Sequence, residues 1–206
     1  MQHITVTLDH PDLQHLMTLD PLLRRLFEQA TPFSVTLSHE PFSFMVFTVL
    51  GQQLSTKVAD LLFARLQAAT QPKLSPSSLL SLSFDALRAL GLSNAKAHTL
   101  LRLAQATLEG YLNHEHFTHG STAAMKHLRQ LKGIGPWSAE MFVMFVLDDI
   151  DVFSVRDLGL YKAYTQFFNL ALTSQQLEEK SAQWSPYRAW VAHALWHVWD
   201  TKETKN

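Results

Sequence analysis

Along most of the chain, apolar residues recur three or four positions apart, with polar residues between them. Such stretches, begun by a capping residue or a proline and ended by glycine or proline, are typical of amphipathic helices. The predicted helices begin near Asp20, Glu40, Ser55, Ser83, Ser93, Ser121, Pro136, Asp157, Ser174 and Pro186. This series of helices with short connections indicates an all-α fold.

Three segments depart from the helical pattern. Residues 3–8 alternate between apolar and polar side chains and predict one short N-terminal strand. Residues 71–83 are rich in proline and serine and are the most linker-like, although a serine–proline pair within them also resembles a helix start. Residues 141–147 are apolar at every position, which suits a buried strand or a buried helix. Pro136, five residues earlier, favours a central helix.

Composition excludes several classes of protein. Of 206 residues, 47% are apolar and 17% are charged, so the chain as a whole is not disordered. The formal net charge is −1, so contact with nucleic acid would need a local basic patch. The absence of cysteine excludes disulfides, thiol catalysis and cysteine-ligated metal clusters. No apolar run approaches the ~20 residues of a membrane span, and no signal-peptide pattern is present, so a cytoplasmic protein without membrane contact is expected.

The segment 128–139 carries the clearest chemical pattern. It reads as a helix, a turn with Gly133 and Gly135, and a second helix begun by Pro136. The glycines allow positive φ and close approach of a ligand, and the amides of the turn and of the next helix start can bind an anion. Local positive charge comes from Lys126, Arg129 and Lys132. An ordinary helical hairpin capped by glycine is the alternative interpretation.

This segment resembles the helix-hairpin-helix motif of DNA-binding proteins. Asp157, which follows Gly135 by 22 residues, completes a pattern similar to the helix-hairpin-helix DNA glycosylase superfamily, and within it to the monofunctional 3-methyladenine DNA glycosylase II enzymes of bacteria and yeasts. Three further blocks resemble that family in the same order, at residues 51–55, 87–97 and 188–196. The resemblance covers about residues 20–199.

The resemblance implies a fold and a substrate. It implies a single glycosylase domain over residues 1–206, in two helical lobes with the active-site cleft between them. The substrate would be double-stranded DNA containing alkylated bases, and a monomer is expected. The alternatives are a non-catalytic protein that binds DNA lesions on the same fold, and a metal-dependent hydrolase using His114, His116 and His119.

The resemblance also implies roles for individual residues. Asp157, at a predicted helix start that favours its negative charge, would stabilise the sugar cation and activate water. DNA phosphate would be bound by Lys132, Gly133, Ile134, Gly135 and Ser138. A monovalent cation at the carbonyls of residues 132–135 is expected when DNA is bound. No catalytic metal is expected.

Base flipping requires a wedge and a pocket. The wedge would be Gln53 with Leu54, although a plain polar turn between two helices is the alternative. The pocket for the alkylated base would be formed by Trp137, Met141 and Trp196, for which a place in the core is the alternative. Electron-rich rings attract a cationic base by stacking and cation–π interaction. The roles of Arg156, Trp190 and His197 stay open.

Two positions differ from relatives of the resembled family. Trp137 stands where the bifunctional relatives place the lysine that forms a Schiff base, so no lyase activity is expected. Leu158 follows the catalytic aspartate where the larger bacterial enzymes of the family have an aromatic residue, which implies a less aromatic pocket.

Overall fold

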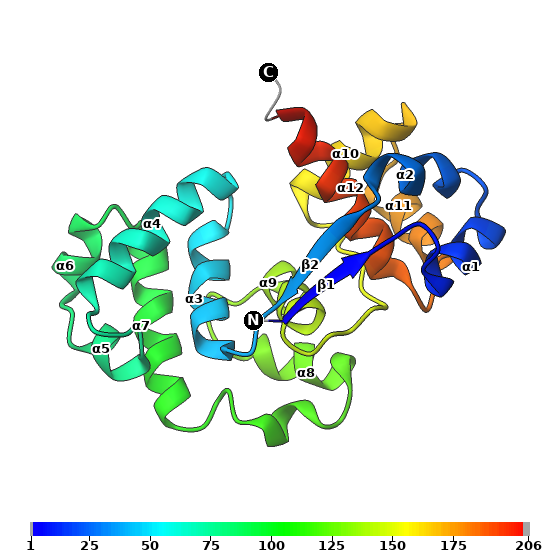
Figure 1. Ribbon diagram of the computed structural model, residues 1–206. Helices are drawn as coiled ribbons and strands as arrows, with labels where there is room; N and C mark the ends of the chain where they lie inside the picture. Colours follow the sequence, from blue (N-terminus) through cyan, green and yellow to red (C-terminus); the bar gives the residue numbers. More distant parts are fainter. Residues whose placement is uncertain (1, 204–206) are drawn as a thin grey trace. The chain divides into compact units, whose positions relative to one another are not determined.

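The computed structural model describes residues 2–203. This part of the chain contains twelve α-helices, one 3-10 helix and two short strands, which confirms the predicted all-α class (Figure 1). None of the helices in residues 2–203 is long and apolar enough to cross a membrane. The chain divides into two compact units. Unit 1 comprises Met1–Leu37 and Asp148–Asn206, and unit 2 comprises Ser38–Leu147. The cleft expected between two lobes stays a prediction.

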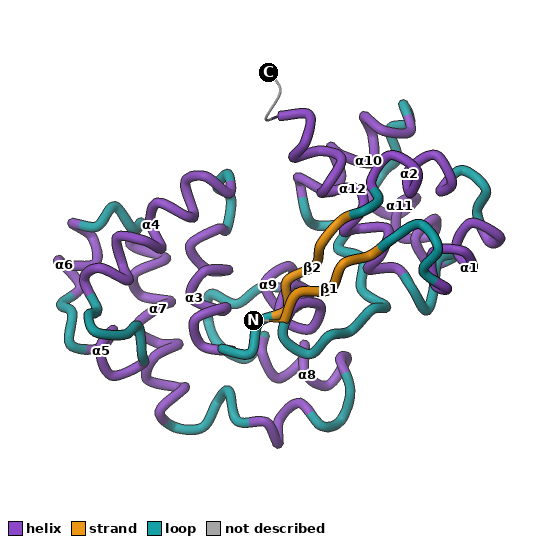
Figure 2. Tube along the Cα trace, in the orientation of Figure 1, coloured by secondary structure: helices purple, strands orange, loops and turns teal. Residues whose placement is uncertain are grey.

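Unit 1 joins the two ends of the chain. Its strands β1 (Gln2–Val6) and β2 (Phe33–Leu37) form an antiparallel pair in which Ile4 lies opposite Val35 (Figure 2). Its helices are α1 (Pro11–Leu19), α2 (Leu23–Ala30), α10 (Leu158–Phe168), α11 (Ser174–Ala182) and α12 (Arg188–Glu203). Helix α12 contacts α2, α10 and β2, so the last helix packs against both N-terminal and C-terminal elements of this unit.

A buried aspartate links the N-terminal part of unit 1 to its C-terminal part. Asp20 is 5% exposed, and its Oδ2 accepts hydrogen bonds from Trp184 Nε1 at 3.0 Å and from Lys180 Nζ at 2.7 Å. Burial by itself would raise the pKa of Asp20. The hydrogen bonds from Lys180 and Trp184, with the charge of Lys180, outweigh burial and hold the pKa below its usual range.

Unit 2 is entirely helical in its described residues. Its helices are α3 (Pro41–Gly51), α4 (Thr56–Ala69), α5 (Pro76–Leu80), α6 (Phe84–Ala89), α7 (Asn94–Leu108), the 3-10 helix η1 (His114–Phe117), α8 (Ser121–Leu128) and α9 (Pro136–Phe145). Helix α3 contacts α4, α7 and α9, and the fully buried side chains of Met45, Val49, Leu100 and Phe142 lie in this core. Serine side chains cap three of these helices, as the sequence predicts, at Ser75, Ser83 and Ser93.

The structure settles the two ambiguous segments of unit 2. Residues 71–83 are not a linker, because α5 lies within them behind a capping box and packs on α7. Residues 141–145 are helical, and Met141–Met144 are buried because other helices surround α9. The prediction of a central helix is confirmed.

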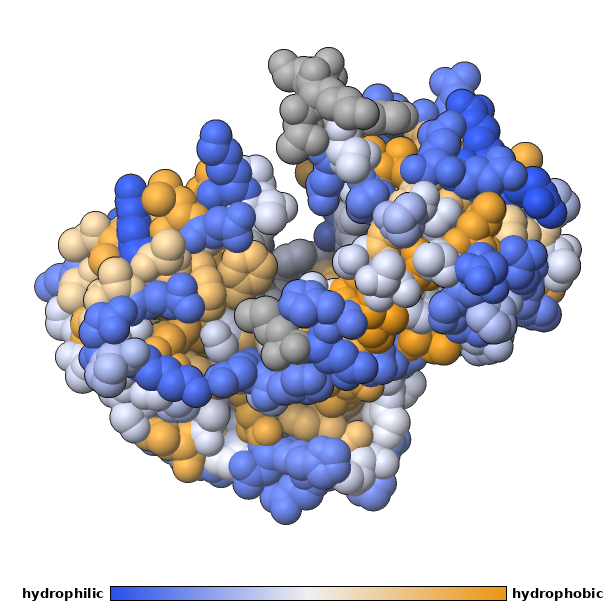
Figure 3. Space-filling view, viewed as in Figure 1, coloured by the Kyte–Doolittle hydropathy of each residue, from blue (hydrophilic) through white to orange (hydrophobic). Residues whose placement is uncertain are grey.

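Three predictions of local structure were incomplete or wrong. Helix α1 and strand β2 were not predicted, although Phe33–Leu37 alternates as a strand does and is buried in the pattern of a half-covered strand. The apolar spacing after Ser55 predicts that Val58, Leu61, Leu62 and Leu66 all face inward, but Val58 and Leu61 are 41% and 51% exposed. Helix α4 packs through Ala59, Leu62 and Leu66 instead. Figure 3 shows hydrophobic residues at the surface of unit 2 in the part where Figure 1 places α4.

Replacing Asp20 by asparagine tests the buried ion pair. The carboxylate has a lowered pKa in the folded state, so its contribution to stability is present above its unfolded pKa and is lost as pH falls through the folded value. We expect Asp20→Asn to lower the free energy of unfolding by about 1–3 kcal/mol at pH 7. It should also reduce the loss of stability between about pH 4 and pH 2.

Urea unfolding at pH 7 and at pH 3 measures both effects. Asp60→Asn, at an exposed position of α4, is the matched control and should change neither. Equal stability of the two variants at pH 7 would contradict a stabilising role for the buried pair.

Candidate functional site

The hairpin between α8 and α9 is shaped by contact with α7. Gly133 has φ +106°, and a Cβ there would lie 2.1 Å from Thr99 Oγ1, well inside van der Waals contact. Thr99 is 4% exposed, and its hydroxyl donates to Ala95 O at 2.8 Å, so the side chain is held in this position. Glycine is therefore required at position 133 both by backbone conformation and by packing.

The second glycine has a different environment. Gly135 is the N-cap of α9, with φ −93° and ψ −179°, an extended conformation open to any residue. A Cβ at position 135 would meet nothing within 4 Å. Pro136 fixes the first turn of α9, so the side of the hairpin at Gly135 faces open space next to a helix N-terminus. This is the geometry that suits an anion.

Side chains from distant segments bind the hairpin carbonyls. Arg102 Nε donates to Lys132 O at 3.2 Å, and Gln52 Nε2 donates to Gly133 O at 3.0 Å. Gly135 O accepts the amide of Ala139 at 3.1 Å, as helix formation requires. A monovalent cation at residues 132–135 stays a prediction, and it would have to share these oxygens with the protein's own donors.

Gln52 holds the hairpin in place, a role that the sequence pattern did not identify. Its Nε2 also donates to Ser138 Oγ at 3.0 Å, so one amide group joins the end of α3 to both the turn and the start of α9. Two glutamines, Gln52 and Gln53, are unusual between two apolar helices, but the sequence pattern indicates no partner for Gln52. No local signal could, because Gly133 lies 81 residues away.

Two of the predicted phosphate contacts lie at buried positions. Ser138 is 1% exposed and its hydroxyl accepts from Gln52, so the hydroxyl does not point to solvent. Ile134 is 4% exposed, and its amide donates to Leu131 O at 3.0 Å inside the turn. Lys132 and Gly133 are exposed and Gly135 is half-buried, and phosphate binding by the hairpin stays a prediction.

The predicted wedge residues lie at an exposed, firmly held turn. Gln53 is exposed and has φ +57°, and Leu54 is 42% exposed. Lys96 Nζ donates to Leu50 O at 2.6 Å and so caps the end of α3, and burial lowers the pKa of this lysine. The side chains of Gln53 and Leu54 are therefore exposed on a turn whose start is held in place by Lys96.

The two predicted pocket residues of unit 2 differ in exposure. Trp137 is half-buried in the first turn of α9, and its ring lies against Gly51, where a Cβ would be 4.0 Å from Cη2. Met141, one turn later, is 6% exposed and belongs to the core. Of these two residues, only Trp137 has enough exposed surface to contact a ligand.

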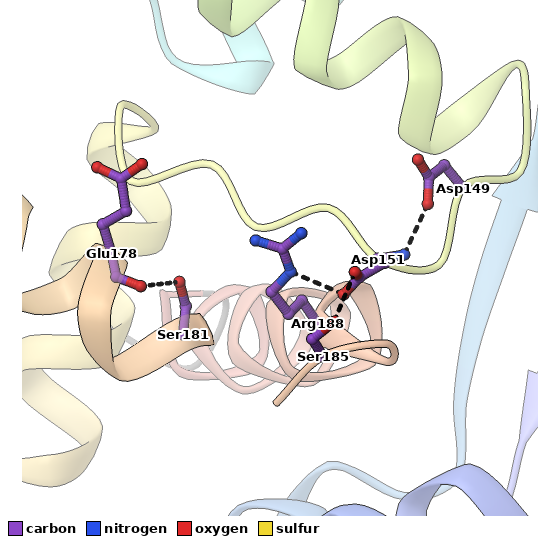
Figure 4. Close-up of polar contacts among 6 residues, drawn as sticks. All are labelled: Asp149, Asp151, Glu178, Ser181, Ser185 and Arg188. Atoms are coloured by element: carbon purple, nitrogen blue, oxygen red, sulfur yellow. Dashed lines mark hydrogen bonds and ion pairs between the residues drawn. The ribbon is translucent and has the colours of Figure 1, made fainter. Parts of the chain in front are cut away.

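In unit 1, the loop that leads to Asp157 is fastened to the start of α12. Arg188 Nε donates to Asp151 Oδ1 at 2.7 Å and Ser185 Oγ donates to Asp151 Oδ2 at 2.8 Å (Figure 4). The amide of Ala189 donates to Ile150 O at 2.8 Å. Burial would raise the pKa of Asp151, but the hydrogen bonds from Arg188 and Ser185, with the charge of Arg188, hold it below its usual range.

Asp157 is the N-cap of α10, as the sequence predicts. Its Oδ1 accepts the amide of Leu160 at 2.6 Å and the indole Nε1–H of Trp196 at 3.3 Å. The carboxylate is half-buried at the positive end of a helix dipole, which favours its negative charge. The structure therefore brings two predicted site residues of unit 1, Asp157 and Trp196, into direct contact.

The other residues of α12 with open roles are now placed. Trp190 is 6% exposed and its Nε1 donates to Asp12 Oδ2 at 2.9 Å, so it is a structural residue. The ring of His197 lies near that of Phe33. Burial lowers the pKa of His193 to about 4, so this imidazole is neutral at neutral pH. Arg156, next to the carboxylate, is exposed.

The histidines of the η1 region do not form a metal site. His116 stacks on His127 with ring centroids 4.3 Å apart. Among the described residues, no three His, Asp or Glu side chains are grouped so that they could hold a metal ion.

Known proteins resemble the chain over nearly its whole length. A sequence profile of the HhH-GPD superfamily of base excision DNA repair proteins matches residues 46–186. DNA-3-methyladenine glycosylase 1 of Schizosaccharomyces pombe is 28% identical over 198 residues, which cover 92% of this chain and 86% of that protein. DNA-3-methyladenine glycosylase 2 of Escherichia coli is 30% identical over 164 residues, which cover 75% of this chain and 55% of that protein.

A solved structure agrees with these similarities. It is the 3-methyladenine DNA glycosylase of S. pombe in complex with abasic DNA, with a TM-score of 0.81 and 28% identity. The match covers 92% of this chain and 95% of that one. The matched part includes residues from both units.

Replacing each hairpin glycine by alanine should show that Gly133 is closely packed and that Gly135 is not. We expect Gly133→Ala to lower the free energy of unfolding by about 1–3 kcal/mol, because the new Cβ overlaps Thr99. Gly135→Ala should change it by less than about 0.5 kcal/mol, because nothing lies near its Cβ. Thermal and urea unfolding measure both. Equal stability of the two variants would contradict the tight contact with α7.

Proposed function

Because the chain belongs to the HhH-GPD superfamily of base excision DNA repair proteins, we propose that it is a monofunctional DNA glycosylase. It hydrolyses the N-glycosidic bond of alkylated purines, such as 3-methyladenine, in double-stranded DNA, and it acts as a monomer. The relatives named DNA-3-methyladenine glycosylase support this substrate class. The observation that carries the proposal is Asp157, a half-buried carboxylate at a helix N-terminus with two hydrogen bonds that orient it.

Asp157 supplies the chemistry. When the bond between C1′ and the base nitrogen breaks, the sugar acquires oxocarbenium character, and a fixed carboxylate stabilises that positive charge. The carboxylate also orients or deprotonates the water that adds to C1′. An alkylated purine such as 3-methyladenine is cationic and leaves readily, so little acid catalysis is needed. Electrostatic stabilisation by one aspartate therefore suits this reaction.

Unit 2 supplies the contacts that hold DNA. The exposed amide-bearing turn at Gly133 and Gly135, with Lys132 beside it, binds backbone phosphate. Gln53 and Leu54 fill the space left when a nucleotide is flipped out of the stack. Trp137 offers an aromatic surface that attracts a cationic base.

Trp137 also explains the monofunctional character. A lyase step needs an amine that attacks C1′ and forms a Schiff base. An indole nitrogen is a hydrogen-bond donor only and cannot act as this nucleophile. The chain therefore releases the base and leaves the abasic strand uncut.

Replacing Asp157 by asparagine tests the reaction. We expect the wild type to release 3-methyladenine from duplex DNA treated with dimethyl sulfate, and Asp157→Asn to release it about 100- to 1,000-fold more slowly, because the negative charge is lost. Chromatography of the released bases under single-turnover conditions measures both rates. Strands incubated with the wild type should remain intact until alkali is added.

Each result has a defined meaning. If neither protein releases a base while both bind the DNA, the protein is a lesion-binding protein and the enzyme assignment fails. Strand cleavage by the wild type without alkali would contradict the monofunctional assignment. Asp60→Asn is the control for a lost surface carboxylate and should keep wild-type activity.

Gly135→Ala tests the phosphate site. Its methyl group would point into the open space beside the start of α9, where it would block a phosphate without disturbing the fold. We expect the Kd for a duplex with a tetrahydrofuran abasic site to rise about tenfold, the effect of one lost charge-assisted hydrogen bond. Fluorescence anisotropy measures the Kd, and Asp157→Asn should bind at least as tightly as wild type. An unchanged Kd for Gly135→Ala would contradict the proposal that the hairpin binds DNA phosphate.

A further inference from the structure

Trp196 and Asp157 form a contact that goes beyond the stacking role expected for this tryptophan. The indole Nε1–H of Trp196, from α12, donates to Asp157 Oδ1 at 3.3 Å. The amide of Leu160, from α10, donates to the same oxygen at 2.6 Å. Two donors from different helices on one oxygen fix the plane of the carboxylate, and neither of these two bonds uses Oδ2.

Gly159 keeps this contact open. A Cβ at position 159 would lie 3.2 Å from Asp157 Oδ1 and 4.0 Å from Trp196 Nε1. The first distance is tighter than ordinary van der Waals contact, so a side chain here would force the Asp157 carboxylate to shift from its present position. Glycine at position 159 therefore leaves the room that the hydrogen bond between Trp196 and Asp157 needs.

The same interaction occurs twice more in unit 1. Trp184 Nε1 donates to Asp20 at 3.0 Å, and Trp190 Nε1 donates to Asp12 at 2.9 Å. Both of these tryptophans are buried, and their bonds tie the C-terminal segment to the N-terminal one. The third tryptophan follows at the same spacing of six residues, but its aspartate is the half-exposed carboxylate at the start of α10.

An indole has a chemical advantage as the partner of a catalytic carboxylate. It donates a hydrogen bond and carries no charge at any working pH. A lysine or arginine in its place would form an ion pair that opposes the carboxylate's attraction for a sugar cation. The ring of His193 lies 5.8 Å from that of Trp196, and burial lowers the pKa of this histidine to about 4. The side of the indole that faces His193 is thus uncharged near neutral pH.

We infer that Trp196 is a positioning residue whose indole N–H sets the orientation of the Asp157 carboxylate. The inference rests on the proposed function, because only in that reaction does the oriented carboxylate face a sugar cation. It assigns to Trp196 a role carried by the nitrogen atom rather than by the aromatic face. The two roles can be separated by an isostere.

Substitution of Trp196 by 3-benzothienylalanine is the test. This residue keeps the size and aromatic faces of tryptophan but has sulfur in place of N–H. We expect the single-turnover rate of 3-methyladenine release from dimethyl-sulfate-treated duplex DNA to fall about 10- to 100-fold, the effect of losing one hydrogen bond to a charged group. The Kd for a duplex with a tetrahydrofuran abasic site should stay within about twofold of wild type.

The same replacement at Trp190 is the matched control. Trp190 lies on α12, as Trp196 does, and its indole N–H binds Asp12 of α1. We therefore expect a lower melting temperature and an unchanged release rate. Full release by the Trp196 isostere would overturn the inference and leave only a stacking role. Absence of release by the wild type itself would instead overturn the proposed function, so the two failures are distinguishable.

Gly159→Ala approaches the same contact without altering Trp196. Alanine suits a helix start, so the variant should fold, and its methyl group should displace Asp157 Oδ1. We expect a release rate reduced at least about fivefold with an unchanged Kd for abasic DNA. A wild-type rate in this variant, confirmed as folded by circular dichroism, would overturn the inference even if the isostere failed to fold.

Discussion

Hydrogen bonds from indole N–H groups to aspartates hold unit 1 together. Two of them, from Trp184 to Asp20 and from Trp190 to Asp12, join positions 164 and 178 residues apart. Asp20 is buried and Asp12 is half-buried, and a carboxylate that loses hydration needs such donors in compensation, so these pairs favour one arrangement of the two chain ends. The position of α12 follows from them. The third pair, between Trp196 and Asp157, depends on that position and extends the same interaction to the carboxylate that we assign to catalysis.

Unit 2 satisfies a different constraint, the polar backbone of a tight hairpin. The turn exposes carbonyl groups that need donors, and Gln52 and Arg102 provide them from α3 and α7. Thr99 closes the space behind Gly133. The turn that carries Gln53 is therefore built onto the hairpin through its neighbour Gln52. A rigid hairpin and a rigid exposed turn on one support are what a protein needs to grip DNA backbone while a nucleotide leaves the stack.

Helix starts were predicted well where a capping residue acts locally. Ser83, Ser93 and Asp157 cap helices through their own side chains, so the signal and the structure lie within four residues of each other. Burial was predicted less well, as Val58 and Leu61 show. Apolar spacing identifies a helix but does not say which part of a wide apolar face meets a neighbour. That choice depends on where the neighbouring helix lies.

The sequence by itself determined the helical class, the hairpin with its two glycines, and an aspartate at the start of a helix 22 residues later. These features arise from residues close together in the chain, whose spacing carries the signal. Only the tertiary structure decided that Gln52 binds the hairpin while Gln53 is exposed, that the hydroxyl of Ser138 is buried, and that the nitrogen of Trp196 meets Asp157. Each of these contacts joins residues 39 to 86 positions apart. No local periodicity encodes such a pairing, because it follows from the packing of whole helices.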